Sequence, residues 1–146
     1  MKRKPFDHCI KENELIETGD IDKALASELL ALAEHRQRFW EQINLDDEYP
    51  SLYLEGHYEI IKELCTAILA LDGWKALNHE CLFAYLKSKR PDLEIDFDFL
   101  LDLKDTRNSI GYRGVKVSPD IWKQNKLRIE LTIKALAVYI RKRLDH

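Results

Sequence analysis

Apolar residues recur at intervals of three and four positions through most of this chain. These intervals place side chains on one face of an α-helix, because about 3.6 residues complete each turn. No segment alternates apolar and polar residues convincingly, and Val115–Lys116–Val117 is too short to make a sheet. The pattern predicts an all-α protein. Its last apolar stripe is Ile129, Ile133, Leu136, Ile140 and Leu144.

Capping residues divide the pattern into about five helices. Asp20, Asn78 and Ser118 are good N-caps, and Gly73 can take the left-handed conformation that closes a helix. We expect an up-and-down bundle with short connections, in which residues 1–19 are a tail or short helix and residues 20–146 form the helical domain. The expected helices cover about residues 21–43, 50–72, 79–90, 96–111 and 119–144. The first carries the stripe Ile21, Leu25, Leu29, Leu32, Arg36, Trp40 and Ile43.

The composition agrees with one folded helical domain. The chain has 146 residues, of which 45% are hydrophobic and 34% are charged. That balance is typical of folded, water-soluble proteins rather than disordered ones. No apolar run approaches the roughly 20 residues that a bilayer requires, and no apolar segment follows the basic N-terminus. We therefore expect neither a membrane span nor a signal peptide.

The three cysteines are Cys9, Cys65 and Cys81. Their number is odd, and no pair has the spacing of metal ligands. Cys65 and Cys81 also lie within apolar helical patterns, so the cysteines are interpreted as buried, reduced thiols. This interpretation favours a reducing compartment, most simply the cytoplasm.

Charge is distributed unevenly along a chain whose net charge is −3. Residues 104–128 carry a net charge of +5, whereas residues 41–63 carry −6. Such polarisation can offer a basic surface to an anion. The simpler interpretation is that both segments are solvated helix faces, and charge alone favours it.

An unusual polar segment, Asp105 to Gly114, lies at the end of the fourth expected helix. Arg107 offers a planar fork of donors to a phosphate, and Asn108 can orient a substrate or hold a loop. The alternative is a helix cap in which Arg107 merely pairs with Asp102 or Asp105.

Residues 20–144 resemble the HEPN family, the higher eukaryote and prokaryote nucleotide-binding fold. That family has a long helical hairpin, a glycine-bounded turn, a short helix, and a fourth helix that ends in an Arg-Asn motif. Leu64 to Leu86 resembles the turn into the third helix. Arg107-Asn108-Ser109-Ile110-Gly111-Tyr112 resembles the family signature of an arginine followed after four to six residues by a histidine.

The resemblance implies an anion-binding or RNA-cleaving site built across a symmetric homodimer. Many family members are metal-independent endoribonucleases, and the toxins among them often pair with a minimal nucleotidyltransferase antitoxin. Carried over, the catalytic positions are Arg107, Asn108 and Tyr112, and nucleic acid or nucleotide would also contact Arg113 and Lys116. Tyr112 stands where the histidine is expected. Gly114 stands where toxins often carry a tyrosine that the partner modifies.

Cleaving RNA without a metal requires a base for the 2′-hydroxyl and an acid for the leaving oxygen. A tyrosine, with a pKa of about 10, is a poor base at neutral pH. Tyr112 can still donate a hydrogen bond or stack on a nucleobase. His57 and His79 are the plausible substitutes, although a structural role is the simpler interpretation of each. No metal-binding motif and no glycine-rich phosphate loop is present, so we expect neither a metal nor a cofactor.

Three functions remain open at this stage. The first is a HEPN-like RNA-binding protein that acts as a metal-independent endoribonuclease, the toxin of a toxin–antitoxin pair. The second is a non-catalytic nucleotide-binding or adaptor subunit that associates with a nucleotidyltransferase. The third is a helical interaction module whose Arg-Asn motif is only a cap.

Overall fold

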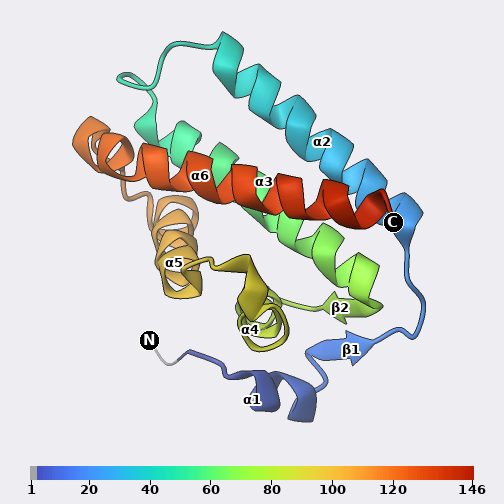
Figure 1. The fold of residues 1–146 in the computed structure, drawn as a ribbon. Coiled ribbons are helices and arrows are strands. Elements are labelled where there is room, and N and C mark those ends of the chain that lie inside the picture. Colours follow the sequence, from blue (N-terminus) through green and yellow to red (C-terminus); the bar gives the residue numbers. More distant parts are fainter. Residues whose placement is uncertain (1–2) are drawn as a thin grey trace.

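The computed structural model describes residues 3–146 and shows an all-α bundle, as the apolar stripes predict (Figure 1). Six α-helices and one small antiparallel ladder occur in this range. The helices are α1 (Phe6–Lys11), α2 (Lys23–Gln42), α3 (Pro50–Asp72), α4 (His79–Lys89), α5 (Phe97–Arg113) and α6 (Pro119–Leu144). The ladder pairs β1 (Leu15–Glu17) with β2 (Trp74–Ala76), and a short 3₁₀ turn covers Pro91–Leu93.

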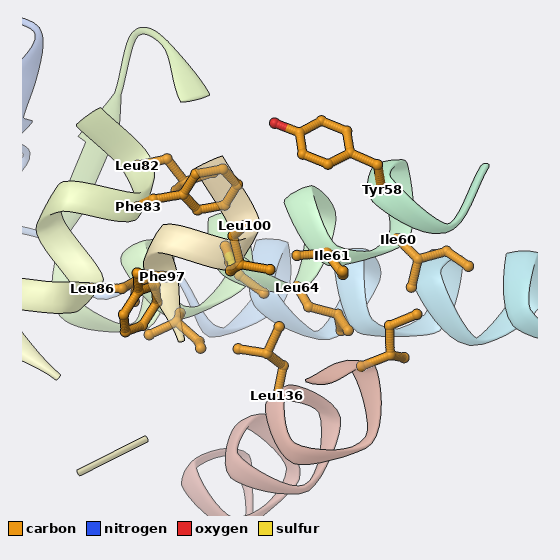
Figure 2. Packing of buried hydrophobic residues seen from close by; sticks show 14 of the residues in the cluster. Tyr58, Ile60, Ile61, Leu64, Leu82, Phe83, Leu86, Phe97, Leu100 and Leu136 are labelled. Carbon is orange, nitrogen blue, oxygen red and sulfur yellow. The ribbon is translucent and has the colours of Figure 1, made fainter. Parts of the chain in front are cut away.

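Helix α3 lies at the centre of the bundle and contacts α2, α4, α5 and α6. It is apolar around most of its circumference. The residues of its inner face recur at intervals of three and four, and all are buried: Leu54, Tyr58, Ile61, Cys65, Ile68 and Leu71. Figure 2 shows Leu64 of α3 in one cluster with Leu100 of α5 and Leu136 of α6. A helix that is buried on several sides can therefore hold α4 and α5 in fixed positions relative to each other.

Most helix ends follow the expected caps. Gly73 closes α3 in the left-handed conformation, with φ of 76°. Asn78 and Ser118 accept backbone hydrogen bonds at the starts of α4 and α6. The expected cap of α2 was wrong, because the side chain that accepts from Leu25 N, at 2.9 Å, is Asp22 rather than Asp20.

The expected inner face of α2 is also displaced. Ala26, Leu30 and Ala33 are buried, whereas Ile21 and Leu32 of the expected stripe are exposed. The small alanines suit a close approach of α2 to α3, and the larger residues beside them are left on the surface. Alanines carry little apolar area, so the buried face of α2 stands out less in the sequence than its exposed leucines do.

The N-terminal segment is attached to the helical body from residue 3 onward. Leu15 of β1 pairs with Ala76 of β2, and Cys9 of α1 forms a disulfide with Cys81 of α4. The expectation of reduced thiols was therefore wrong for these two residues, while Cys65 is a free, buried thiol. The cysteines consequently give no support to a reducing compartment. Within residues 3–146, every helix is too short or too polar to cross a membrane.

A buried carboxylate fixes the position of α4. Asp72, at the end of α3, accepts hydrogen bonds from Tyr85 Oη at 2.9 Å, Arg90 Nε at 2.9 Å and Arg143 Nη1 at 2.5 Å. Burial alone would raise the pKa of Asp72, but these hydrogen bonds outweigh it and hold that pKa below its ordinary value. The network ties the ends of α3, α4 and α6 together.

Gly56 of α3 supplies a test of this packing. A Cβ built on Gly56 would lie 2.2 Å from Cζ2 of Trp40, far inside van der Waals contact. We therefore expect Gly56→Ala to lower the free energy of unfolding by ~1–3 kcal/mol, although alanine is the better helix former. Gly111→Ala is the control, because its Cβ meets nothing within 4 Å, and it should stabilise the protein by up to ~1 kcal/mol. Urea unfolding measures both, and a Gly56→Ala protein as stable as the parent would contradict this account.

Candidate functional site

A cavity of about 380 Å³ lies between the start of α4 and the end of α5. We call it the Arg107 cavity. The N-terminal segment contributes Lys4 to its lining, so the site joins three parts of the chain that are distant in sequence. The side chains that matter for its chemistry are His79 and Glu80 of α4, and Lys104, Arg107, Asn108 and Tyr112 of α5.

The Arg-Asn motif is helical to its end. Helix α5 was expected to end at Gly111, but it continues to Arg113, and Gly114 closes it with φ of 65°. Asn108 and Tyr112, four residues apart, therefore share one face of the helix. Tyr112 lies at the mouth of the cavity with 82% of its surface exposed. Arg113 and Lys116 are also exposed, but neither lines the Arg107 cavity.

Arg107 has no carboxylate partner among residues 3–146. Asp102 and Asp105, its expected alternative partners, pair instead with Arg3, at 2.6 and 3.1 Å. The only hydrogen bond from the Arg107 side chain to another described side chain is the one that Nη1 donates to Asn108 Oδ1 at 3.3 Å. The rest of the guanidinium fork is left to bind an anion in the cavity.

Lys104 is the second cation of the site. Its ammonium group is buried and lies 2.5 Å from Glu80 Oε1. The second oxygen of Glu80 is buried without a hydrogen-bond partner in the described residues. Sequence reasoning placed Lys104 only in a basic segment. The signal for its role was spacing, since Lys104, Arg107 and Asn108 fall at helical intervals of three and four.

His79, the first residue of α4, brings an imidazole to the Arg107 cavity. Its Nδ1 lies 2.8 Å from the hydroxyl of Tyr58. Figure 2 shows the ring of Tyr58 with its hydroxyl turned away from the aliphatic side chains of the core. Burial lowers the pKa of His79 below its ordinary value, and the positive charges of Lys62, Arg107 and Lys104 lower it further. The imidazole is therefore mainly neutral near pH 7.

His57 lies elsewhere and is part of the core. Its buried ring contacts Trp40 and Trp122, with centroid distances of 5.8 and 4.9 Å. Nδ1 donates a hydrogen bond to the carbonyl oxygen of Tyr53 at 2.7 Å. Burial lowers the pKa of His57 as well. Of the two histidines that sequence reasoning singled out, only His79 lies at the Arg107 cavity.

One group of side chains in the described residues has the proximity that metal ligands need, and it lies outside the cavity. It consists of Cys9, Glu14 and Cys81. Both sulfur atoms are bonded to each other in the disulfide, so neither is a thiolate that could coordinate a metal.

No protein-family model, curated protein or solved structure matches this chain. What defines the protein is therefore its own geometry, an all-α bundle with a cavity lined by Arg107, His79 and the Lys104–Glu80 ion pair.

Proposed function

We propose that this chain is a HEPN-like RNA-binding protein and that the Arg107 cavity binds a phosphate of the RNA strand. The observation that carries the proposal is the meeting of His79 with Arg107 in one cavity. Arg107 offers unpaired donors, and Lys104 lies in the same cavity as an ion pair with Glu80. Charge-assisted donors of this kind are what a phosphodiester needs.

We propose further that the protein is a metal-independent endoribonuclease in which His79 replaces the motif histidine. Neutral His79 takes the proton of a ribose 2′-hydroxyl, and the 2′ oxygen attacks the adjacent phosphorus. The bond from phosphorus to the 5′ oxygen then breaks, this oxygen takes a proton from a water molecule, and the hydroxide left behind takes the proton from His79. The products are a 2′,3′-cyclic phosphate and a 5′-hydroxyl end.

The other side chains support this step. Arg107 stabilises the charge that grows on the phosphoryl oxygens, and Lys104, paired with Glu80, lines the same cavity. Asn108 holds the guanidinium of Arg107 through its Oδ1, and Tyr112 offers a hydroxyl and a ring at the exposed mouth. The direct test is to incubate the protein with a single-stranded RNA and analyse the ends by mass spectrometry. Intact RNA after long incubation would contradict the catalytic part of the proposal.

The contact between His79 and Tyr58 also favours a second function, binding without cleavage. If Nδ1–H donates to the Tyr58 hydroxyl, Nε2 keeps a lone pair and serves as the base. If the hydroxyl donates to Nδ1 instead, Nε2 carries the proton and cannot act as a base. The protein would then be a nucleotide-binding or adaptor subunit. Nucleotide binding without cyclic-phosphate products would identify this case.

The cellular setting follows from the resemblance alone. We propose that the protein is the toxin half of a toxin–antitoxin pair in the cytoplasm, with a minimal nucleotidyltransferase as its partner. Gly114 replaces the tyrosine that such partners often modify. The partner would therefore have to act by binding, or at a different hydroxyl such as that of exposed Tyr112.

Cleavage is expected to persist in EDTA. The base, the cations and the hydrogen-bond donors of the proposed site are all side chains, so no step requires a divalent ion. The measurement compares cleavage rates of a labelled RNA before and after extensive chelation. A rate that falls on chelation and returns when Mg²⁺ or Zn²⁺ is added would overturn the mechanism.

A two-fold homodimer is expected in solution, with the two Arg107 side chains facing one cleft. Tyr112, at the mouth of the cavity, and Val115, just beyond the end of α5, expose large apolar surfaces, which a second copy would cover. Light scattering over a concentration series measures the mass. A monomer at every concentration would count against the dimer, while Tyr112→Asp in a true dimer should shift the mass toward the monomer.

A further inference from the structure

A second cavity, of about 670 Å³, lies beside the Arg107 cavity. The two cavities share Leu77, Asn78 and His79 in their linings. The remaining walls of the second cavity come from residues 18–22, the first turn of α2, the C-terminal half of α3, β2 and Leu82 of α4. A ligand held at Arg107 therefore reaches the second cavity by crossing one short segment, residues 77–79.

The wall of this second cavity is mainly apolar and contains one indole ring. Leu25, Leu69, Leu82 and Trp74 line it. The ring of Trp74 is held from outside the cavity, because it contacts Tyr85 with a centroid distance of 5.4 Å. A fixed ring in a concave, apolar wall suits a flat ligand, since little ordering is needed on binding.

The polar side chains of this wall are largely engaged already. Thr66 Oγ1 donates to the Lys62 carbonyl, and Asp22 caps α2. The Asn78 amide accepts from Cys81 N and donates to Glu14. Few side-chain groups are left to read the hydrogen-bonding edge of a ligand, so recognition must come mainly from contact with apolar faces.

We propose that the second cavity is a nucleobase pocket, which holds a base of the RNA strand whose phosphate binds at Arg107. The inference rests on the proposed function and extends it to the substrate, a single strand with at least one unpaired base beside the bound phosphate. Bases have two flat, apolar faces, and stacking on an aromatic ring tolerates every base. The pocket therefore accepts purines and pyrimidines with little preference.

The shared wall of the two cavities favours a base over an apolar side chain of a partner protein. Arg107 lies on one side of residues 77–79 without a carboxylate partner in the described residues, and the second cavity, lined by two lysines and two aspartates, lies on the other. An anionic backbone with apolar groups attached matches a free guanidinium beside an apolar wall. A protein segment would have to bring acidic residues next to a large apolar side chain to match it.

The test uses two surface leucines of α2 that differ in where they point. Leu25 lines the second cavity and is 41% exposed, whereas Leu32 does not line it and is 42% exposed. Leu25→Trp fills the pocket, and Leu32→Trp is the matched control. The probes are 2′-O-methyl RNA trinucleotides, which resist cleavage, either intact or with one residue lacking its base. Fluorescence anisotropy measures their affinities.

Removing the base at one particular position should weaken binding to the parent protein about tenfold, as expected for one stacked base. Leu25→Trp should lose the same factor in affinity for the intact strand and none for that abasic strand, while Leu32→Trp binds both strands like the parent.

Equal affinities of Leu25→Trp and parent for the intact strand would overturn the base pocket, as would abasic strands that all bind with the affinity of the intact strand. If Arg107→Ala still weakens binding in either case, the phosphate site stands and only the base pocket fails. If the parent protein binds no trinucleotide, both the phosphate site and the base pocket are wrong.

Discussion

A His79→Gln variant is expected to cleave RNA about 100 to 10,000 times more slowly than the parent, with its affinity for RNA unchanged. Glutamine keeps a polar side chain at the first position of α4, but it cannot take a proton from a 2′-hydroxyl. The loss should therefore appear in the rate constant at saturating RNA rather than in the concentration dependence. Single-turnover cleavage of a labelled RNA and equilibrium binding separate the two quantities.

His35→Gln is the matched control for this experiment. His35 is an exposed histidine of α2 that does not line the Arg107 cavity. The His35→Gln variant should cleave RNA at the parental rate. This result would show that the slow cleavage of His79→Gln comes from the loss of His79 itself and not from replacing a histidine in general. If His79→Gln cleaves RNA as fast as the parent, His79 is not the base, and the binding-only function becomes the better proposal.

The pH dependence of cleavage tests the role of His79 as the base independently of the substitution. Burial and the neighbouring cations lower the pKa of His79 from its ordinary value of 6.5. A base works only when it is deprotonated, so cleavage should rise with pH through the lowered pKa. The acidic limb of the rate profile should therefore have its midpoint below pH 6.5, and the rate should be near its plateau at pH 7. A midpoint above pH 6.5 would contradict the assignment.

The long helices with a continuous apolar face could be predicted from the sequence. Short elements that are held in place by residues distant in the sequence could not. The stripe of α6 is buried as expected except for Leu144, which is partly buried, and the inner face of α3 is buried throughout. The β1–β2 ladder has only three residues in each strand, too few to show a period. The Cys9–Cys81 disulfide joins residues 72 positions apart, and no local pattern reveals which cysteines meet.

The residues of the candidate site divide in the same way, into those that a local motif predicts and those that only tertiary contacts bring together. Arg107, Asn108 and Tyr112 lie within six residues of one helix, so a local motif was enough to bring them together. His79 reaches them because Asp72 fixes the end of α3 to α4 and because α3 holds α4 against α5. Lys4 arrives through the N-terminal segment, which the sequence described as a tail or short helix. These contacts depend on tertiary packing, and sequence reasoning could only name His79 as one of two substitutes.

Arg107→Ala is expected to weaken RNA binding by ~1.5–3 kcal/mol, roughly ten- to hundredfold, because a charge-assisted contact with phosphate is lost. Melting should stay near normal. The guanidinium has no carboxylate partner in residues 3–146, so its removal breaks no ion pair there. Anisotropy titrations and thermal unfolding measure the two effects separately. Binding should also become less dependent on salt, because one phosphate contact fewer releases fewer counterions.

Arg107→Lys makes the same test sharper. Lysine keeps the charge but removes the planar fork, so a bidentate phosphate contact is still impaired, while a purely electrostatic one is nearly restored. We expect impaired binding and near-normal melting for this variant as well. Arg38→Ala is the control, because Arg38 is an exposed arginine of α2 that does not line the Arg107 cavity, and it should bind like the parent. If both Arg107 variants bind RNA with parental affinity, Arg107 holds no phosphate, and the proposed site is wrong.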